Sequence, residues 1–182
     1  MGMAADVCVS PTGPADCPSD AVIYTTSDEG GWVANTSAYP SARWIWRGDV
    51  TPTSDADLVI AVFQATFDLG PNPTGTINIA ADDYAEVLVN GSVACSVGSV
   101  TDETTAASAQ QEFPSFSLTP YLVEGTNTIT IVGQNGPNTY VGGGSTCSPC
   151  TYMQNTAGVV FGGTLAYSSP AASPGTSPNS PQ

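Results

Sequence analysis

The stretch Thr76–Val97, TINIAADDYAEVLVNGSVACSV, carries the clearest fold signal of the chain. Apolar and polar residues alternate in its first part, which is the pattern of a β-strand with one buried face. The acidic pair Asp82 and Asp83 interrupts the alternation, which resumes over Tyr84–Val89 and stops at Asn90-Gly91. Asn-Gly is the dipeptide that best tolerates the two positive φ angles of a type I′ hairpin turn. The stretch therefore predicts a strand, an acidic corner, a second strand, a tight turn and a return strand.

Further apolar runs lie on both sides of this stretch. The longest is Leu58–Leu69, in which Phe63 and Phe67 share one predicted face. Shorter strand candidates are Ala21–Thr25, Ser41–Arg47, Phe113–Leu122, Thr128–Gln134 and Ala157–Tyr167. Gly98–Gln111 is polar and is predicted to form a mobile surface loop, and no segment shows a helical period. About eight short strands separated by Gly- and Pro-rich turns predict an all-β fold, a single antiparallel β-sandwich or jelly roll.

The chain of 182 residues has the length of one ordinary domain. Residues 1–20 are proline-rich and polar and are predicted to form an N-terminal arm. Residues 21–167 contain the strand candidates and form the predicted sandwich domain. Residues 168–182, SSPAASPGTSPNSPQ, have low complexity and frequent prolines, which predicts a disordered linker or tail.

Acidic residues dominate the charge of the chain. Sixteen Asp and Glu residues outnumber two cations, Arg43 and Arg47, and Lys and His are absent, so the formal net charge is −14. Such a surface repels the phosphates of nucleic acids and anionic lipids, so neither is an expected partner. No apolar run reaches the roughly 20 residues of a membrane-spanning helix, so no membrane insertion is expected. The composition is compatible with an extracellular, cell-surface or virion-surface location.

The five cysteines are Cys8, Cys17, Cys95, Cys147 and Cys150. Disulfides are the default in a loop-rich chain of extracellular composition, and without histidine these spacings do not match a zinc site. We expect a bond between Cys8 and Cys17, which would tether the arm. Cys147 and Cys150 are expected to be oxidised either together or with Cys95, and the odd count leaves one thiol free or bonded to another molecule.

Trp44 and Trp46 are separated by one residue and are predicted to share one face of an extended segment. Tryptophans at this spacing form either a platform on which sugar rings stack or part of the hydrophobic core, and the core is the more frequent use. Together with Tyr84, which follows the acidic pair, they are the candidate carbohydrate-binding residues.

The order of these motifs resembles the galactose-binding-domain-like jelly rolls that are found beside bacterial glycosidases and in surface proteins. The resemblance covers roughly Trp44–Tyr167. It rests on Trp-Ile-Trp, on the acidic pair followed by a strand and Asn90-Gly91, on the turn Gly125–Asn127 and on the last strand. It implies a β-sandwich, and many unrelated functions occur on that fold.

The acidic pair followed by a strand and an Asn-Gly turn is also similar to the PA14-type adhesin domain. In that family two aspartates hold a calcium ion that contacts sugar hydroxyls. The resemblance implies that Asp82 and Asp83 are metal ligands and that calcium is a cofactor, although Tyr84 stands where PA14 domains usually have glycine. Calcium takes about six to eight oxygens, and the further candidate donors are backbone carbonyls, Asp49, Asp55 and Asp57. The alternative is that the pair only caps the strand corner by accepting backbone N–H bonds.

No catalytic apparatus is expected. Without histidine the chain cannot form a Ser-His-Asp or Cys-His device, and two adjacent carboxylates do not flank a glycosidic bond from opposite sides. We therefore expect a non-catalytic module for adhesion or carbohydrate binding, assisted by calcium, whose partner is a glycan or another cell-surface ligand. The alternative is a structural subunit of an extracellular filament, coat or capsid, whose partners are copies of itself. The odd cysteine, the polar arm and the tail favour that alternative.

Overall fold

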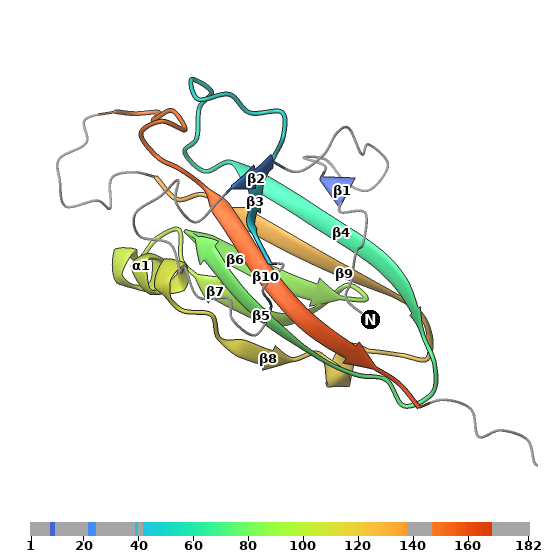
Figure 1. Ribbon diagram of the computed structural model, residues 1–182. Helices are drawn as coiled ribbons and strands as arrows, with labels where there is room; N and C mark the ends of the chain where they lie inside the picture. The colour runs from blue at the N-terminus through green and yellow to red at the C-terminus, as the bar shows by residue number, and fades with distance from the viewer. Residues whose placement is uncertain (1–7, 10–21, 25–38, 40–41, 138–146, 169–182) are drawn as a thin grey trace, which may run out of the picture.

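The computed structural model describes residues 8–9, 22–24, 39, 42–137 and 147–168, and these form two antiparallel sheets packed face to face (Figure 1). The strand order in the first sheet is β1 (Cys8–Val9), β4 (Ile60–Leu69), β9 (Gly125–Gln134), β6 (Tyr84–Val89) and β7 (Ser92–Gly98). The order in the second sheet is β2 (Val22–Tyr24), β3 (Trp44–Trp46), β10 (Gly158–Ala166), β5 (Thr74–Asp82) and β8 (Ser115–Ser117). The predicted antiparallel β-sandwich is confirmed.

The hydrophobic core lies between the two sheets and is built from alternate residues of each long strand. In β5 the buried residues Ile77, Ile79 and Ala81 lie on the predicted inward face. In β6 the residues Ala85, Val87 and Val89 do the same. In β4 the buried residues are Ala61, Phe63 and Leu69, and Phe67 packs against the cluster, as does Val59 just before the strand. The alternation in the sequence therefore identified the buried faces of these strands correctly.

The hairpin between β6 and β7 has the predicted turn. Asn90 and Gly91 have φ angles of 53° and 80°, as a type I′ turn requires. The Asn90 side chain also binds β9 and the segment before it: its Nδ2 donates to the Tyr121 carbonyl (3.0 Å) and to Asn127 Oδ1 in β9 (2.9 Å). Its Oδ1 accepts from the Thr128 backbone N–H at 2.9 Å. The residue therefore sets the turn and joins it to the start of β9.

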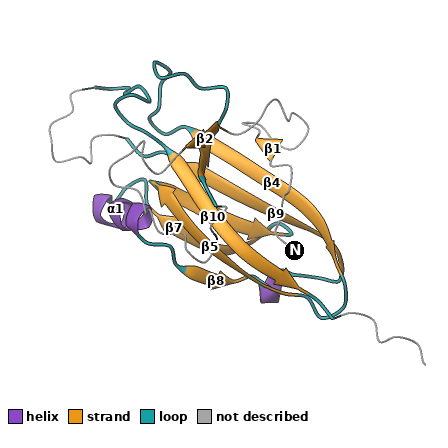
Figure 2. Cartoon of the chain, in the orientation of Figure 1, coloured by secondary structure: helices purple, strands orange, loops and turns teal. Residues whose placement is uncertain are grey.

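A short helix, α1 (Glu103–Gln111), replaces most of the loop that was predicted over Gly98–Gln111. Asp102 caps it, because the Asp102 carboxylate accepts from the Thr105 N–H at 2.8 Å. Ala106 and Ala109 are the buried residues of the helix, which lies beside β5 and β7 (Figure 2). Since the buried side chains are only alanines, the helix has no apolar stripe that the sequence pattern could reveal.

The long connections gather at one end of the sandwich, which we call the loop end. They are residues 47–59 between β3 and β4, residues 99–102 with α1, and the described residues 135–137 and 147–157 between β9 and β10 (Figure 1). The opposite end has the tight turns after β4 and after β6. The acidic pair Asp82 and Asp83 is therefore at the loop end.

The two termini were assigned to an arm and a tail. Part of the predicted arm, Cys8–Val9, forms β1, an edge strand that pairs antiparallel with β4. The predicted disordered tail lies outside the described residues, apart from Ser168, whose N–H donates to the Pro71 carbonyl at 2.8 Å. Within the described ranges, no helix has the length and apolar character needed to cross a membrane.

Candidate functional site

The acidic corner is the place where the chain passes from one sheet to the other. Asp82 ends β5 in the second sheet, Tyr84 begins β6 in the first, and Asp83 joins them. The peptide bond between the two aspartates is cis. Asp82 is 7% exposed and is the one buried charged residue among the described residues.

Two segments that are distant in the sequence reach the carboxylates. Gln110 of α1 donates its Nε2 to Asp82 Oδ1 at 2.6 Å. The Gly136 backbone N–H, just after β9, donates to Asp83 Oδ2, also at 2.6 Å. Burial raises the pKa of Asp83, and the hydrogen bond from Gly136 partly opposes that shift. The alternative, in which the acidic pair caps the strand corner, predicts a bond from a backbone N–H such as that of Gly136. Metal binding by Asp82 and Asp83 stays a proposal.

Gly98 at the end of β7 is also adapted to the corner. A Cβ on Gly98 would lie 1.8 Å from the Asp83 carbonyl oxygen, and the residue has a φ angle of 78°. Only glycine meets both conditions without strain. The Asp83 carbonyl in turn accepts from the Ser99 N–H at 3.2 Å. The backbone of the corner is therefore held from β7 as well.

Asn135 next to Gly136 is a functional candidate that the sequence did not reveal. It is fully buried, and its Nδ2 donates to the carbonyls of Ala56 (2.9 Å) and Asn155 (3.3 Å). Because both amide hydrogens point to carbonyl oxygens, the orientation of the amide is fixed. Its Oδ1 has no hydrogen-bond partner among the described residues. Native proteins seldom bury a free acceptor, and a bound water or ion is a usual reason.

The oxygen donors that the corner itself offers to a cation are the carboxylates of Asp82 and Asp83. Within the described ranges, no group of three or more His, Cys, Asp or Glu side chains could hold a metal ion. The structure does not bring Asp49, Asp55 or Asp57 to the pair. Asp49 forms a two-point ion pair with Arg47 (2.6 and 2.9 Å), Asp55 is exposed, and Asp57 binds Cys150 and Asn155. Hard oxygen ligands of this kind suit calcium, and backbone carbonyls and water would complete its shell.

Trp46 belongs to the core and not to a surface platform. It has no exposed area, and its Nε1 donates to the Tyr152 hydroxyl at 3.0 Å. Its ring lies against Gly133, where an added Cβ would be 2.8 Å from the ring, and near Phe63 at 6.5 Å between centroids. The carbohydrate-binding prediction for Trp46 is therefore wrong, because β3 directs this ring into the main cluster between the sheets.

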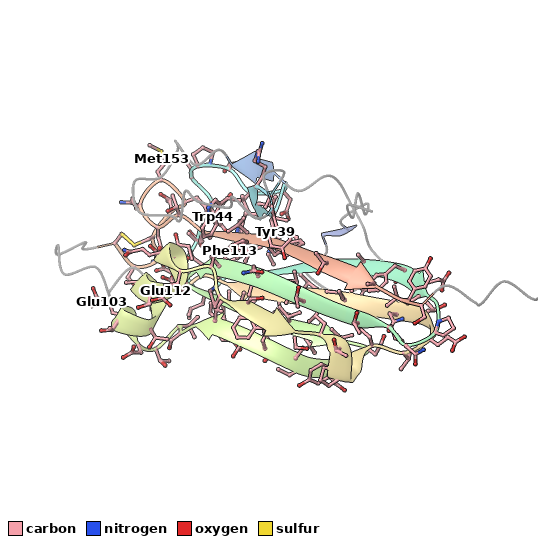
Figure 3. All side chains as sticks on the ribbon, turned by 60° about the horizontal axis from the view of Figure 1, so that its bottom comes forward. Tyr39, Trp44, Glu103, Glu112, Phe113 and Met153 are labelled. Carbon is pink, nitrogen blue, oxygen red and sulfur yellow. A yellow bond between two sulfur atoms is a disulfide. The ribbon has the colours of Figure 1, made fainter. Side chains whose placement is uncertain are left out.

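Trp44 is also fully buried, but in a second, smaller cluster with Ala80 and Val160. Phe113 packs against this cluster, and Tyr39 meets Phe113 edge to face at 6.4 Å between ring centroids (Figure 3). The carbohydrate-binding prediction for Trp44 is therefore wrong, because its buried ring offers no face to a sugar. The two rings enter different clusters although only one residue of β3 separates them.

Tyr84 is the predicted carbohydrate contact that stays partly exposed. It lies on the outer face of β6, and its hydroxyl donates to Glu86 Oε2 at 3.3 Å. Partial burial and the charge of Glu86 raise the pKa of Tyr84, so the phenol stays protonated. The ring has an apolar face and a polar tip, and the predicted role of Tyr84 in carbohydrate binding stays a proposal.

The cysteines partly follow the prediction. Cys147 and Cys150 form a disulfide, with their Cα atoms 4.9 Å apart. Cys95 is a free thiol in the core, 8% exposed, and burial raises its pKa to about 11. Its assignment as a disulfide cysteine is wrong, because it points inward from β7 and the loop cysteines bond to each other. Cys17 lies outside the described residues, so the Cys8–Cys17 bond stays a prediction.

Comparison with known proteins gives matches only among solved structures: no family model and no curated protein matches the chain. An α-L-rhamnosidase from Streptomyces avermitilis, complexed with L-rhamnose, has a TM-score of 0.46 and 19% identity, over 69% of this chain and 11% of that one. A lectin from Pleurotus ostreatus in complex with GalNAc has a TM-score of 0.41 and 16% identity, over 68% of this chain and 33% of the lectin. A family 35 carbohydrate binding module from an environmental isolate has a TM-score of 0.40 and 14% identity, over 91% of this chain and 93% of the module.

The match to the family 35 module, at 14% identity, extends over nearly the full length of both chains. The chain spans only 11% of the rhamnosidase and 33% of the lectin.

Proposed function

We propose that this chain is a non-catalytic carbohydrate-binding domain of an extracellular, cell-surface or virion-surface protein, and that calcium at Asp82 and Asp83 assists the binding. The observation that carries the proposal is the acidic corner: two adjacent carboxylates at the loop end, one of them 7% exposed. The order of motifs in the sequence, which resembles galactose-binding-like and PA14-type domains, supports the same function.

The electrostatics of the corner favour a cation. Two adjacent carboxylates repel each other, and burial, which raises the pKa of Asp83, makes its charged form costly. A divalent cation removes both costs at once. Asn135 Oδ1, a buried acceptor one residue from the Gly136 N–H that binds Asp83, is a further oxygen ligand of the type that calcium takes. When bound, calcium would supply a positive centre to which vicinal sugar hydroxyls coordinate.

The surroundings of the acidic corner fit the binding of a neutral polar ligand better than the hydrolysis of a glycosidic bond. Residues 47–59, α1 and the described parts of the β9–β10 connection supply mainly hydroxyl, amide and backbone groups, and Tyr84 lies at the same end. Catalysis of glycoside hydrolysis needs two carboxyl groups about 5 Å or more apart on opposite sides of the bond. Asp82 and Asp83 are consecutive residues on one side, so binding is the function they support.

Glycan-array binding tests the proposal, with calcium or with chelator present. We expect wild-type protein to bind a subset of glycans only with calcium, and Asp82→Asn with Asp83→Asn to lose that binding. Asp55→Asn is the matched control, because Asp55 lies in an exposed loop position. At a hundredfold excess over Kd, calcium should raise the free energy of unfolding by about 2.7 kcal/mol in the wild type and in Asp55→Asn, and leave the double variant unchanged.

Two outcomes would contradict the proposal in different ways. Glycan binding that is equal in calcium and in chelator would remove the metal and keep the carbohydrate. Absence of binding to every glycan, together with filaments or shells in negative-stain micrographs, would favour the structural-subunit alternative.

A further inference from the structure

Three side chains join the connections at the loop end. Asn135 Nδ2 donates to the Ala56 carbonyl, which fastens the end of β9 to the loop before β4. Asn155 Nδ2 donates to Asp57 Oδ1 and to the Gly136 carbonyl, both at 2.8 Å. Asp57 accepts from two residues of the β9–β10 connection, Cys150 and Asn155. None of these contacts is local, since each joins residues 19 to 98 positions apart.

A continuous series of hydrogen bonds leads from Asp57 to the acidic corner. Asp57 Oδ1 accepts from Asn155, the same Asn155 amide donates to the Gly136 carbonyl, and the Gly136 N–H donates to Asp83 Oδ2 at 2.6 Å. Gly136 is therefore held at its carbonyl by Asn155 while its N–H reaches Asp83. Loss of the Asn155 contact would free Gly136 to rotate away from the carboxylate.

The other oxygen of Asp57 binds the disulfide loop. Asp57 Oδ2 accepts from the Cys150 N–H at 3.0 Å, and the Ala56 N–H donates to the Cys150 carbonyl at 2.8 Å. Cys150 is fully buried and bonded to Cys147. Asp57 therefore lies between the disulfide loop on one side and Asn155 on the other.

We propose that Asp57 is a positioning residue for the acidic corner, which acts through Asn155 to hold Gly136 against Asp83 and couples the Cys147–Cys150 loop to that site. The inference deepens the proposed function and rests on it, because it names residues that prepare the same corner for its cation and glycan. The effect of Asp57 on the pair passes through two other residues, Asn155 and Gly136.

The chemistry of position 57 explains why an aspartate is needed. Both of its oxygens accept from N–H donors, one from a backbone and one from an amide side chain. Asparagine has the same shape but only one acceptor oxygen, and its NH₂ group would face one of these donors. Asp57→Asn therefore loses the contact with either Cys150 or Asn155, with little change of volume, and in both cases position 57 no longer joins the disulfide loop to Asn155.

Hydrogen exchange of the Gly136 amide, followed by NMR in chelator, is the direct test. We expect Asp57→Asn to lower the protection of that amide by about tenfold, since a hydrogen bond to a carboxylate is lost or weakened. Asp55→Asn changes the net charge by the same amount in the same loop and should leave the protection unchanged within about twofold.

The double variant Asp57→Asn with Asn155→Asp separates positioning from general loop stability. The amide introduced at position 57 would donate to the new carboxylate at position 155 and still accept from the Cys150 N–H, so the melting temperature should recover in part. The new carboxylate has no hydrogen for the Gly136 carbonyl, so the protection of Gly136 should stay low. Should Asp57→Asn fail to fold, Asn155→Ser removes the same donor to Gly136 and carries the same expectation.

The outcomes decide the two proposals separately. Unchanged Gly136 protection in Asp57→Asn, or equal losses in Asp57→Asn and Asp55→Asn, overturns the positioning role whatever calcium does. A wild-type protein that shows no calcium response overturns the metal proposal, while the Gly136 measurement still decides this one. Where both the metal proposal and the positioning role of Asp57 hold, the calcium affinity of Asp57→Asn should be about tenfold lower than that of the wild type, and the affinity of Asp55→Asn should be unchanged.

Discussion

Replacing Asn127 by alanine tests how much stability one buried amide contributes. Asn127 has no exposed area and makes four hydrogen bonds. Its Oδ1 accepts from Asn90 Nδ2 and from the Val123 N–H, both at 2.9 Å. Its Nδ2 donates to the carbonyls of Val123 (2.7 Å) and Gly125 (2.9 Å). The amide is therefore saturated, and it organises the turn that leads into β9.

The magnitude follows from what the four partners can do without Asn127. A typical hydrogen bond contributes about 1 kcal/mol net, which gives about 4 kcal/mol for the set. Val123 is 51% exposed and Asn90 lies at an exposed turn, so water can reach part of the vacated groups. We therefore expect Asn127→Ala to lower the free energy of unfolding by about 3 kcal/mol.

Urea denaturation followed by tryptophan fluorescence measures this change, because Trp44 and Trp46 are both buried in the folded state. Thr126→Ala is the matched control: Thr126 is an exposed neighbour whose hydroxyl donates to Asp68 Oδ1 at 2.6 Å, and we expect a loss of only about 0.5 kcal/mol. A loss below about 1 kcal/mol for Asn127→Ala would refute the claim that its partners depend on it.

Three further predictions concern the core, the thiols and the acidic corner. Phe63→Ala should destabilise the fold by about 3–5 kcal/mol in chemical denaturation, since Phe63 is 2% exposed in the main cluster; a loss near 1 kcal/mol would contradict its place there. At pH 8 without reductant, iodoacetamide should leave Cys95 unmodified in the folded protein and label it after unfolding. The reason is that the Cys95 thiol is buried and has a pKa of about 11. Rapid labelling of the native protein would place this thiol at the surface. In chelator, the free energy of unfolding of the wild type relative to that of Asp83→Asn should fall as the pH rises through the raised pKa of Asp83. The reason is that the folded state binds the Asp83 proton more tightly than the unfolded state does, so loss of that proton favours unfolding. Parallel pH curves for the two proteins would show that Asp83 is not desolvated.

Local patterns in the sequence were sufficient to predict the strands of the two sheets and their buried faces. Alternation placed Ile77, Ile79 and Val87 inward, and Asn90-Gly91 predicted the hairpin turn, because both signals act over a few residues. The same patterns failed for α1. Its stability comes from the Asp102 cap and from two small buried alanines, and neither creates an apolar period.

The candidate site was harder to predict because its contacts are not local. The sequence identified Asp82 and Asp83, which are adjacent, but gave no sign that Gln110 and Gly136 would bind them from 28 and 53 positions away. Trp44 and Trp46 were ambiguous for a related reason: their burial depends on which strands cover β3. The buried free oxygen of Asn135 depends on how the β3–β4 and β9–β10 connections pack together, so no sequence signal indicates it.

The amide of Asn90 has a consequence for glycosylation. Asn90-Gly91-Ser92 fits the acceptor sequence for N-linked glycans, and Asn90 lies at an exposed turn, where such sites usually occur. The sugar would attach to Nδ2, the atom that donates to both Tyr121 and Asn127. Attachment replaces one of the two N–H groups, so a glycosylated Asn90 would lose one of these bonds. A glycan at Asn90 would therefore weaken the joint between the hairpin and β9.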